Sequence, residues 1–183
     1  MRRFATTALI LTAALVAMPQ DADAQMNAPA RDGFFIGFGL GGGSFGCTDC
    51  ADRQSGVSGH LTLGGAVSER VLLGFESSGW TKEEQGARMT HANASLIAQF
   101  YPAAASGFFM KGGLGWSRLE ISASGGGVSF SGSTNGLGLT AGLGYDVRVG
   151  NNLSLSPYGM FGWGNFDGGN AQNLQLGLGL TWH

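Results

Sequence analysis

Three polar residues in one short region are of the types that an acyl hydrolase uses. Ser58 and His60 lie two residues apart, and Glu76 follows after a turn. A hydroxyl nucleophile, an imidazole base and an orienting carboxylate are the parts of a Ser-His-acid triad. Two such residues at positions i and i+2 of a strand are common by chance, however. We therefore predict no catalytic residue and keep a Ser/His lipid deacylase as a less favoured alternative.

A second group with possible chemistry is the C-x-x-C pattern of Cys47 and Cys50, which has Asp49 and Asp52 beside it. In an exported chain such a pair favours a small disulfide that stiffens a loop. A redox-active pair needs a device that lowers a thiol pKa, and the sequence offers none nearby. One C-x-x-C also does not supply four zinc ligands. The prediction is a loop disulfide, with free thiols or a metal site as alternatives, and no cofactor or metal.

Four charged residues lie inside segments that otherwise alternate apolar and small side chains: Glu76, Lys111, Asp146 and Arg148. All four fall in the phase opposite to the apolar residues. Paired charges avoid the large free-energy cost of an isolated buried ion. The pattern predicts an interior charge cluster in which Lys111 pairs with Asp146 from the neighbouring strand. The cluster is interpreted as a structural plug, or alternatively as a gate in a narrow water path.

The N-terminal residues read as an export signal. Arg2 and Arg3 precede an uncharged apolar run from Ala8 to Met18, and Ala22-Asp23-Ala24 resembles a cleavage site. That run is shorter than the roughly 20 residues that a spanning helix needs. The sequence thus divides into a cleaved signal peptide (1–24), a short lead-in (25–33) and one domain (34–183).

Period-2 alternation of apolar and small or polar residues dominates this domain, which indicates β-strands. The clearest case is the last stretch, NLQLGLGLTWH, with Leu176, Leu178, Leu180 and Trp182 on one face. Eight such segments are predicted, with long connections after the first, third and fifth and short ones after the second, fourth and sixth. Their ranges are 34–43, 56–67, 71–80, 89–101, 108–117, 134–149, 153–164 and 173–183.

The composition shows which face is apolar and what partners are excluded. The chain has 34 Gly, 12% charged residues and a net charge of −2, which gives no basic patch for nucleic acid. The glycine runs continue through strands without a following helix, so they are not phosphate-binding loops; inward glycines instead leave room for a few large side chains. Apolar faces free of charge suit lipid, where a charge costs about 2–4 kcal/mol at the bilayer midplane.

Aromatic residues near the strand ends form two predicted girdles at the two membrane interfaces. One girdle lies near the short turns and the other near the long connections. The first contains Phe34, Phe100, Phe108, Tyr145 and Trp182, and the second contains Trp80, Trp116, Trp163 and Phe166.

With these features the chain resembles the small outer-membrane β-barrel proteins of the OmpA/OmpX-like class. The resemblance is carried by the signal peptide and by FFMKGGLGWS (108–117), GLGLTAGLGYDVRVG (136–150) and LQLGLGLTW (174–182). It implies an all-β, eight-stranded antiparallel transmembrane barrel with both termini in the periplasm. It is specific for fold and location and weak for activity, because the class includes scaffolds, adhesins, narrow pores and enzymes.

The prediction is therefore an integral outer-membrane protein of a Gram-negative-type bacterium with a structural or surface-interaction role and no enzymatic activity. The alternatives are a narrow channel with a charge-gated lumen, a lipid A-modifying enzyme, and a soluble secreted β-barrel. The expected partners are outer-membrane lipids and lipopolysaccharide, together with the barrel-insertion machinery, which would recognise Leu176, Leu178, Leu180 and Trp182. The protein is expected to be a monomer.

Overall fold

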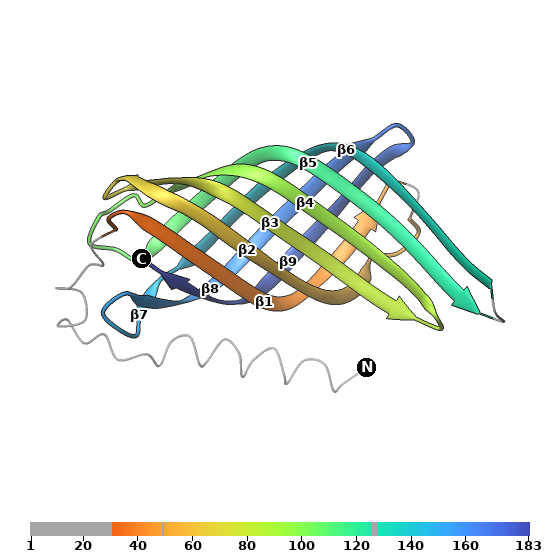
Figure 1. Ribbon diagram of the computed structural model, residues 1–183, viewed down its shortest axis with the longest axis horizontal. Helices are drawn as coiled ribbons and strands as arrows, with labels where there is room; N and C mark the ends of the chain where they lie inside the picture. The colour runs from red at the N-terminus through yellow and green to blue at the C-terminus, as the bar shows by residue number, and fades with distance from the viewer. Residues whose placement is uncertain (1–30, 49, 126–127) are drawn as a thin grey trace.

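The computed structural model describes residues 31–48, 50–125 and 128–183 and shows an antiparallel β-barrel (Figure 1). The predicted signal peptide and most of the lead-in lie outside these residues. No helix in the described ranges has the length and hydropathy needed to cross a membrane. The strands are β1 (Phe34–Cys47), β2 (Gln54–Ser68), β3 (Val71–Glu84), β4 (Ala87–Phe100), β5 (Phe108–Gly125), β6 (Val128–Tyr145), β7 (Val147–Arg148), β8 (Leu153–Phe166) and β9 (Gly169–Trp182).

The barrel closes because its first and last long strands pair with each other. Each strand pairs with the next along the chain, and β1 pairs with β9 from Ile36↔Trp182 to Cys47↔Ala171. The two-residue β7 continues the line of β6, since both pair with β8. Between them the Asp146 backbone N–H donates to the Gly107 carbonyl instead of joining the ladder. The predicted eight-stranded antiparallel barrel is thus confirmed.

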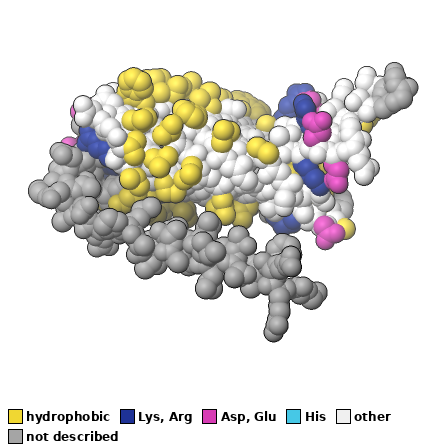
Figure 2. Space-filling view, turned by 90° about the horizontal axis from the view of Figure 1, so that it is seen from below, with side chains coloured by type: hydrophobic (Ala, Val, Ile, Leu, Met, Phe, Trp, Pro, Cys, Tyr) yellow, Lys and Arg dark blue, Asp and Glu magenta, His cyan; other side chains and the backbone are white. Residues whose placement is uncertain are grey.

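Alternation along the strands sorts side chains between the outer surface and the interior. The pattern is clearest in β1, where the even-numbered Phe34 to Leu40 are exposed and the odd-numbered positions are buried. Hydrophobic side chains gather over the barrel wall, whereas charged side chains gather mainly toward one end (Figure 2). Large exposed apolar side chains and a polar, glycine-rich interior invert the pattern of a water-soluble barrel and fit a lipid environment.

The strands extend further at one end than the sequence predicts. Residues 81–88 were expected to form a charged loop, but β3 and β4 join through a two-residue turn, Gln85-Gly86. Both turn residues have positive φ, 51° and 81°, as a type I′ hairpin requires. Residues 118–133 were expected to form a Gly/Ser-rich loop, with a flared hairpin as the alternative. Because β5 and β6 pair as far as Gly125↔Val128, the hairpin alternative is the correct one. The apolar alternation fades there because strands outside a bilayer need no lipid-facing side.

These extensions form what we term the projecting sheet: residues 81–90 of the β3–β4 hairpin and residues 118–135 of the β5–β6 hairpin. The two hairpins pair with each other as far as Ala87↔Ala123. The sheet extends beyond the closed barrel at the end opposite to the C-terminus (Figure 1). We call this the projecting end, and the opposite end, which holds His183, the C-terminal end.

Candidate functional site

The centre of the lumen contains a buried ion pair between β3 and β5. The Lys111 ammonium donates to Glu76 Oε2, and Thr62 Oγ1 donates to the same oxygen at 2.9 Å. The two charged side chains are only 4% and 1% exposed. The prediction that Lys111 pairs with Asp146 is therefore wrong. Barrel strands tilt relative to the axis, so side chains at one height come from offset positions, and Lys111 reaches across β4 to Glu76.

Asp146 belongs to a separate group at the C-terminal end. Its carboxylate accepts hydrogen bonds from the Tyr101 hydroxyl at 2.7 Å and from Ser156 Oγ at 2.6 Å. The Arg31 guanidinium lies over the Tyr101 ring, 3.5 Å from its centroid, and donates to the carbonyls of Ala104 and Ser106. Burial, reinforced by the Asp146 carboxylate, raises the pKa of the Tyr101 phenol above its ordinary value. The phenol therefore stays neutral and keeps donating to Asp146.

The predicted four-residue lumen cluster is thus not one cluster. Glu76 and Lys111 pair at the centre, Asp146 lies nearer one end, and Arg148 is exposed at the rim. There its guanidinium donates to the carbonyls of Gly150 and Asn151. Arg148 keeps the register of β6, since it pairs with the inward-facing Ser154 as Gly144 does with Tyr158, but it lies at the end of its strand, where its side chain contacts the following turn instead of entering the lumen.

Arg31 is a residue of the lumen that the sequence analysis missed. It is fully buried at the C-terminal end, although it lies in what was taken as a polar lead-in. Strand alternation gives no signal for it, because Arg31 precedes β1 and Gly33, between Arg31 and the strand, has a φ of 74°. Together with Phe35, Leu72 and Phe109, which pack around Tyr101, Arg31 fills this end of the lumen.

We expect Arg31→Ala to destabilise the barrel by about 2–4 kcal/mol. It removes a desolvated cation–π contact worth about 2 kcal/mol and leaves two partly buried carbonyls without their donor. Urea titration in detergent micelles, followed by tryptophan fluorescence, would measure the change. Arg70→Ala, in the exposed turn between β2 and β3, is the matched control and should be close to neutral. Equal unfolding midpoints for the two variants would contradict this assignment.

An aromatic layer fills the lumen at the projecting end. Phe45 and Trp80 stack with centroids 4.9 Å apart, and the Trp80 indole N–H donates to the Gly43 carbonyl at 3.2 Å. Phe166 and Leu119 pack against this pair. The predicted girdle positions of Trp80 and Phe166 are therefore wrong: Trp80 is 1% exposed. Its position four residues after Glu76 places it in the same inward phase, a signal that was available in the sequence.

Directly below this layer a chain of hydrogen bonds holds His91 in one tautomer. The Gly162 backbone N–H donates to Asn173 Oδ1 at 3.1 Å, so the Asn173 amide nitrogen faces His91 Nδ1 at 3.0 Å. Nδ1 must then accept, and the ring proton sits on Nε2, which donates to Ser117 Oγ at 2.9 Å. His91 therefore cannot accept a proton from Ser117, and the group is structural despite its Ser-His-amide composition.

The residues behind the less favoured hydrolase alternative, Ser58, His60 and Glu76, do not form a triad. Ser58 Oγ and His60 Nδ1 have no hydrogen-bond partner among the described residues. Glu76 is engaged by Lys111 and Thr62. The His60 ring instead packs edge-on against Tyr158, with centroids 4.5 Å apart.

Two inward glycines show why the lumen can hold large side chains. A Cβ atom on Gly39 would lie 2.5 Å from the His60 ring and 2.7 Å from the Tyr158 ring. A Cβ atom on Gly56 would lie 2.8 Å from the Trp80 indole and 2.4 Å from a backbone carbonyl. These contacts are shorter than any real Cβ tolerates, so the glycines make the space that the rings occupy.

At the projecting end, Cys47 and Cys50 are joined by a disulfide, and both pack against the Phe45–Trp80 layer. We expect the native protein to resist alkylation by iodoacetamide and to gain two carbamidomethyl groups after reduction. Intact-protein mass spectrometry would measure both states. Alkylation of the unreduced protein at Cys47 or Cys50 would show that the thiols are free.

The outer wall carries the remaining predicted girdle residues. Trp116 is 73% exposed, and Trp163 is partly exposed on the outward phase of β8. At the C-terminal end the exposed aromatic residues are Phe34, Phe100, Phe108, Tyr145 and Trp182. The proposed insertion residues also face outward, with Leu176, Leu178 and Trp182 exposed and Leu180 partly so. His183 turns back and stacks on Phe35.

Comparison with known proteins supports the fold. No family model matches the chain, and no curated protein does. Among solved structures it is similar to Ail, the attachment invasion locus protein of Yersinia pestis, with a TM-score of 0.63 and 15% identity over 82% of this chain and 99% of Ail. It is also similar to Neisserial surface protein A, with a TM-score of 0.59 and 18% identity over 82% of this chain and 97% of that protein.

The N-terminal β-barrel domain of Pseudomonas aeruginosa OprF is a third similar structure, with a TM-score of 0.51 and 11% identity over 82% and 98% of the two chains. At these identities the likeness concerns the fold alone. The chain has the fold of the small eight-stranded outer-membrane barrels, and the predicted resemblance to the OmpA/OmpX-like class is confirmed at that level.

Proposed function

We propose that the protein is an integral outer-membrane barrel that acts at the cell surface through its projecting sheet. The observation that carries the proposal is the contrast between the two parts of the molecule. The lumen is occupied by packed side chains, whereas four strands continue beyond the barrel as a sheet with free edges. In the orientation that we propose, the projecting end lies outside the cell and the C-terminal end lies in the periplasm.

Two aromatic layers support a role other than conduction. Phe45 and Trp80 fill the lumen at the projecting end, and Phe35, Tyr101 and Arg31 fill it at the other. The chamber between them, next to Lys111 and Tyr158, has a volume of about 20 Å³, room for about one water molecule. A hydrated ion would have to displace a ring at each end to pass.

A narrow channel is the second candidate, because several buried polar atoms in the lumen have no hydrogen-bond partner in the part of the chain that the structure describes. They include Ser58 Oγ, Glu76 Oε1, Tyr158 Oη and Gln175 Oε1. Such atoms take up water where space allows. A continuous row of water molecules through the lumen would require the Arg31 side chain and the Tyr101 ring beneath it to move.

The membrane partners follow from the outer wall. Lipid acyl chains would contact the belt of exposed leucines and phenylalanines, and lipopolysaccharide would surround the projecting end. Recognition by the barrel-insertion machinery through β9, as a monomer, is part of the same proposal. This part of the proposal is supported by the row of outward-facing residues of β9 that ends at Trp182.

Three measurements test the proposal. An epitope inserted at the Gln85-Gly86 turn should be bound by antibody on intact cells, and carbonate washing should leave the protein in the membrane fraction. The purified barrel should give planar-bilayer current indistinguishable from empty lipid. Discrete conductance steps would favour the channel instead, and release by carbonate would favour a soluble barrel.

A further inference from the structure

The outer wall of the barrel has a groove just below the projecting sheet, between β2 and β3. Gly59 and Gly79 are paired across these two strands, and Gly59 also pairs with the exposed Leu40 of β1. Paired residues of an antiparallel sheet share a face, so both glycines face outward. Because neither has a side chain, the backbone itself forms the floor of the groove.

The groove has a volume of about 270 Å³, and its lining is almost wholly apolar. Leu40 and Val57, both exposed, flank it, and Thr81 and Thr90 lie at the end nearer the projecting sheet. In lipid no hydrophobic force draws apolar surfaces together, so binding depends on how closely the surfaces fit. A hollow that stays unfilled loses dispersion contacts. The occupant that suits this wall is a hydrocarbon chain of a neighbouring lipid.

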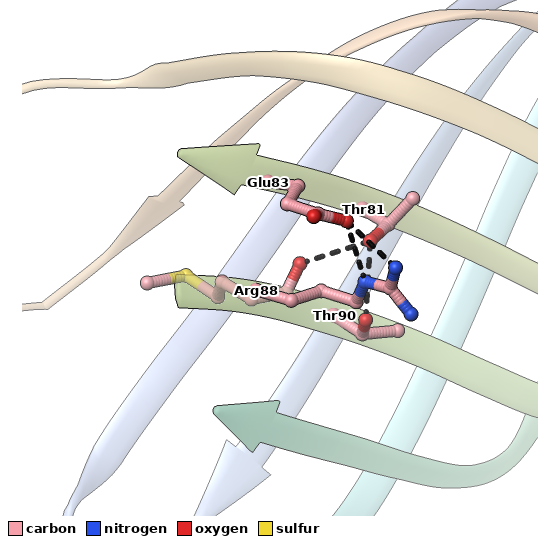
Figure 3. A network of polar contacts seen from close by, with 5 residues as sticks. Thr81, Glu83, Arg88 and Thr90 are labelled. Atoms are coloured by element: carbon pink, nitrogen blue, oxygen red, sulfur yellow. Dashed lines mark hydrogen bonds and ion pairs between the residues drawn. The ribbon is translucent and has the colours of Figure 1, made fainter. Parts of the chain in front are cut away.

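Toward the projecting end the outward residues change from small to charged. Along β3, Gly79 is followed by Thr81 and Glu83, and on β4 Thr90 and Arg88 lie opposite these two. Figure 3 shows the network: the Arg88 guanidinium pairs with Glu83 at 2.6 Å, and Thr81 Oγ1 lies 3.2 Å from Thr90 Oγ1. Charges are costly at the centre of the hydrocarbon region and tolerated at its border. The groove therefore opens at the level of the lipid head groups.

The two threonines at this opening select the kind of lipid chain. Thr81 Oγ1 donates to the Met89 carbonyl at 3.2 Å, so the proton between the two hydroxyls comes from Thr90. Thr90 Oγ1 keeps a lone pair that can accept a hydrogen bond. The chains of lipid A carry donors close to the head group, namely amide N–H and 3-hydroxyl groups. The ester links of a glycerophospholipid supply acceptors only.

We propose that this groove binds one acyl chain of lipid A, with Thr90 Oγ1 accepting a hydrogen bond from the amide or hydroxyl group of that chain. The inference rests on the proposed function, because it requires the groove to lie in the outward-facing half of the membrane, where lipopolysaccharide is the expected lipid. A second copy of the barrel does not fit. A two-fold axis through this face would set groove against groove and leave both unfilled.

Native mass spectrometry of the full barrel in detergent micelles tests the groove, with purified lipid A and with phosphatidylethanolamine as the two probes. The wild type should bind one lipid A, at least fivefold more tightly than the phospholipid. Gly79→Val fills the groove, and a Cβ atom there would lie 3.7 Å from its nearest neighbour, the His91 carbonyl oxygen, so no clash results. This variant should bind lipid A at least fivefold more weakly.

Gly112→Val is the matched control. Gly112 is an exposed glycine of β5, and a Cβ atom there would lie 4.0 Å from its nearest neighbour, the Thr140 carbonyl oxygen. It should bind lipid A within twofold of the wild type. Gel migration without heating shows which variants are folded. If Gly79→Val does not fold, the smaller Gly79→Ala takes its place and should weaken binding at least twofold.

Thr90→Val tests the selectivity, because it keeps the shape of the groove and removes the acceptor. It should lower the affinity for lipid A to that for phosphatidylethanolamine and leave the latter unchanged. Equal binding of the two lipids by the wild type, or equal loss in the folded Gly79 and Gly112 variants, would overturn the inference.

The result is separable from the proposed function. A barrel that binds lipid A through Gly79 and Thr90, but whose epitope antibody does not reach on intact cells, would overturn only the proposed function. A surface-exposed barrel that does not discriminate between the two lipids would overturn only the groove.

Discussion

Lys111→Met lowers the free energy of unfolding by about 3–5 kcal/mol, because it leaves the Glu76 carboxylate buried without its counter-ion. Thr62 still donates one hydrogen bond, but a single hydroxyl does not replace an ammonium. Urea titration in detergent micelles, read by tryptophan fluorescence and by gel migration without heating, gives the change directly. Glu76→Gln should have a comparable effect, since it strands the ammonium instead.

The double variant Glu76→Gln/Lys111→Met separates the ion pair from simple loss of packing. It removes both charges while nearly preserving side-chain volume, so most of the lost stability should return. The matched control is Arg118→Met, which breaks the exposed Arg118–Glu120 pair and should cost no more than about 1 kcal/mol. A double variant as unstable as Lys111→Met would show that the pair is not the source of the effect.

Leu178→Arg should reduce the amount of assembled barrel severely, with a cost of about 2–4 kcal/mol to the inserted state. Leu178 is 58% exposed in the middle of the outward row of β9, and it lies opposite Leu40 in the strand pair that closes the barrel. An arginine there would meet lipid in the proposed orientation. The fraction of heat-modifiable protein in purified membranes, measured by immunoblot, reports the loss.

Two controls distinguish a lipid effect from a strand effect. Leu178→Val keeps an apolar side chain at the same site and should assemble normally. Ser133→Arg places the same charge on an outward position of β6 in the projecting sheet, beyond the proposed bilayer, and should also assemble. Normal assembly of Leu178→Arg would argue that this wall does not face lipid.

The sequence predicts the barrel because strand alternation is a local property. In a strand with one face toward lipid, apolar residues must recur at every second position. The sequences of β1 and β9 show that period, and it can be recognised without knowing which strands they pair with. The same logic correctly places Glu76, Lys111 and Asp146 inside. Applied consistently, it would also have placed Trp80 inside, since Trp80 shares the phase of Glu76 in β3.

The tertiary structure alone decides which interior groups meet. Strand tilt brings Lys111 to Glu76 across β4, and the position of Arg148 at the end of its strand leaves its side chain exposed at the rim. Neither arrangement leaves a periodic trace in the residues, because both depend on how strands are staggered around the closed barrel.

The extent of the strands also depends on pairing rather than on pattern. Beyond the apolar belt the side chains of residues 81–90 and 118–135 are polar on their outer face, so their pattern favours loops and leaves a flared hairpin in residues 118–133 only as an alternative. Only the registers of β3–β4 and β5–β6 reveal that they are strands. The local sequence therefore determined the two faces of the barrel wall, whereas the closed, staggered sheet decided which lumen charges meet and how far the hairpins of the projecting sheet extend.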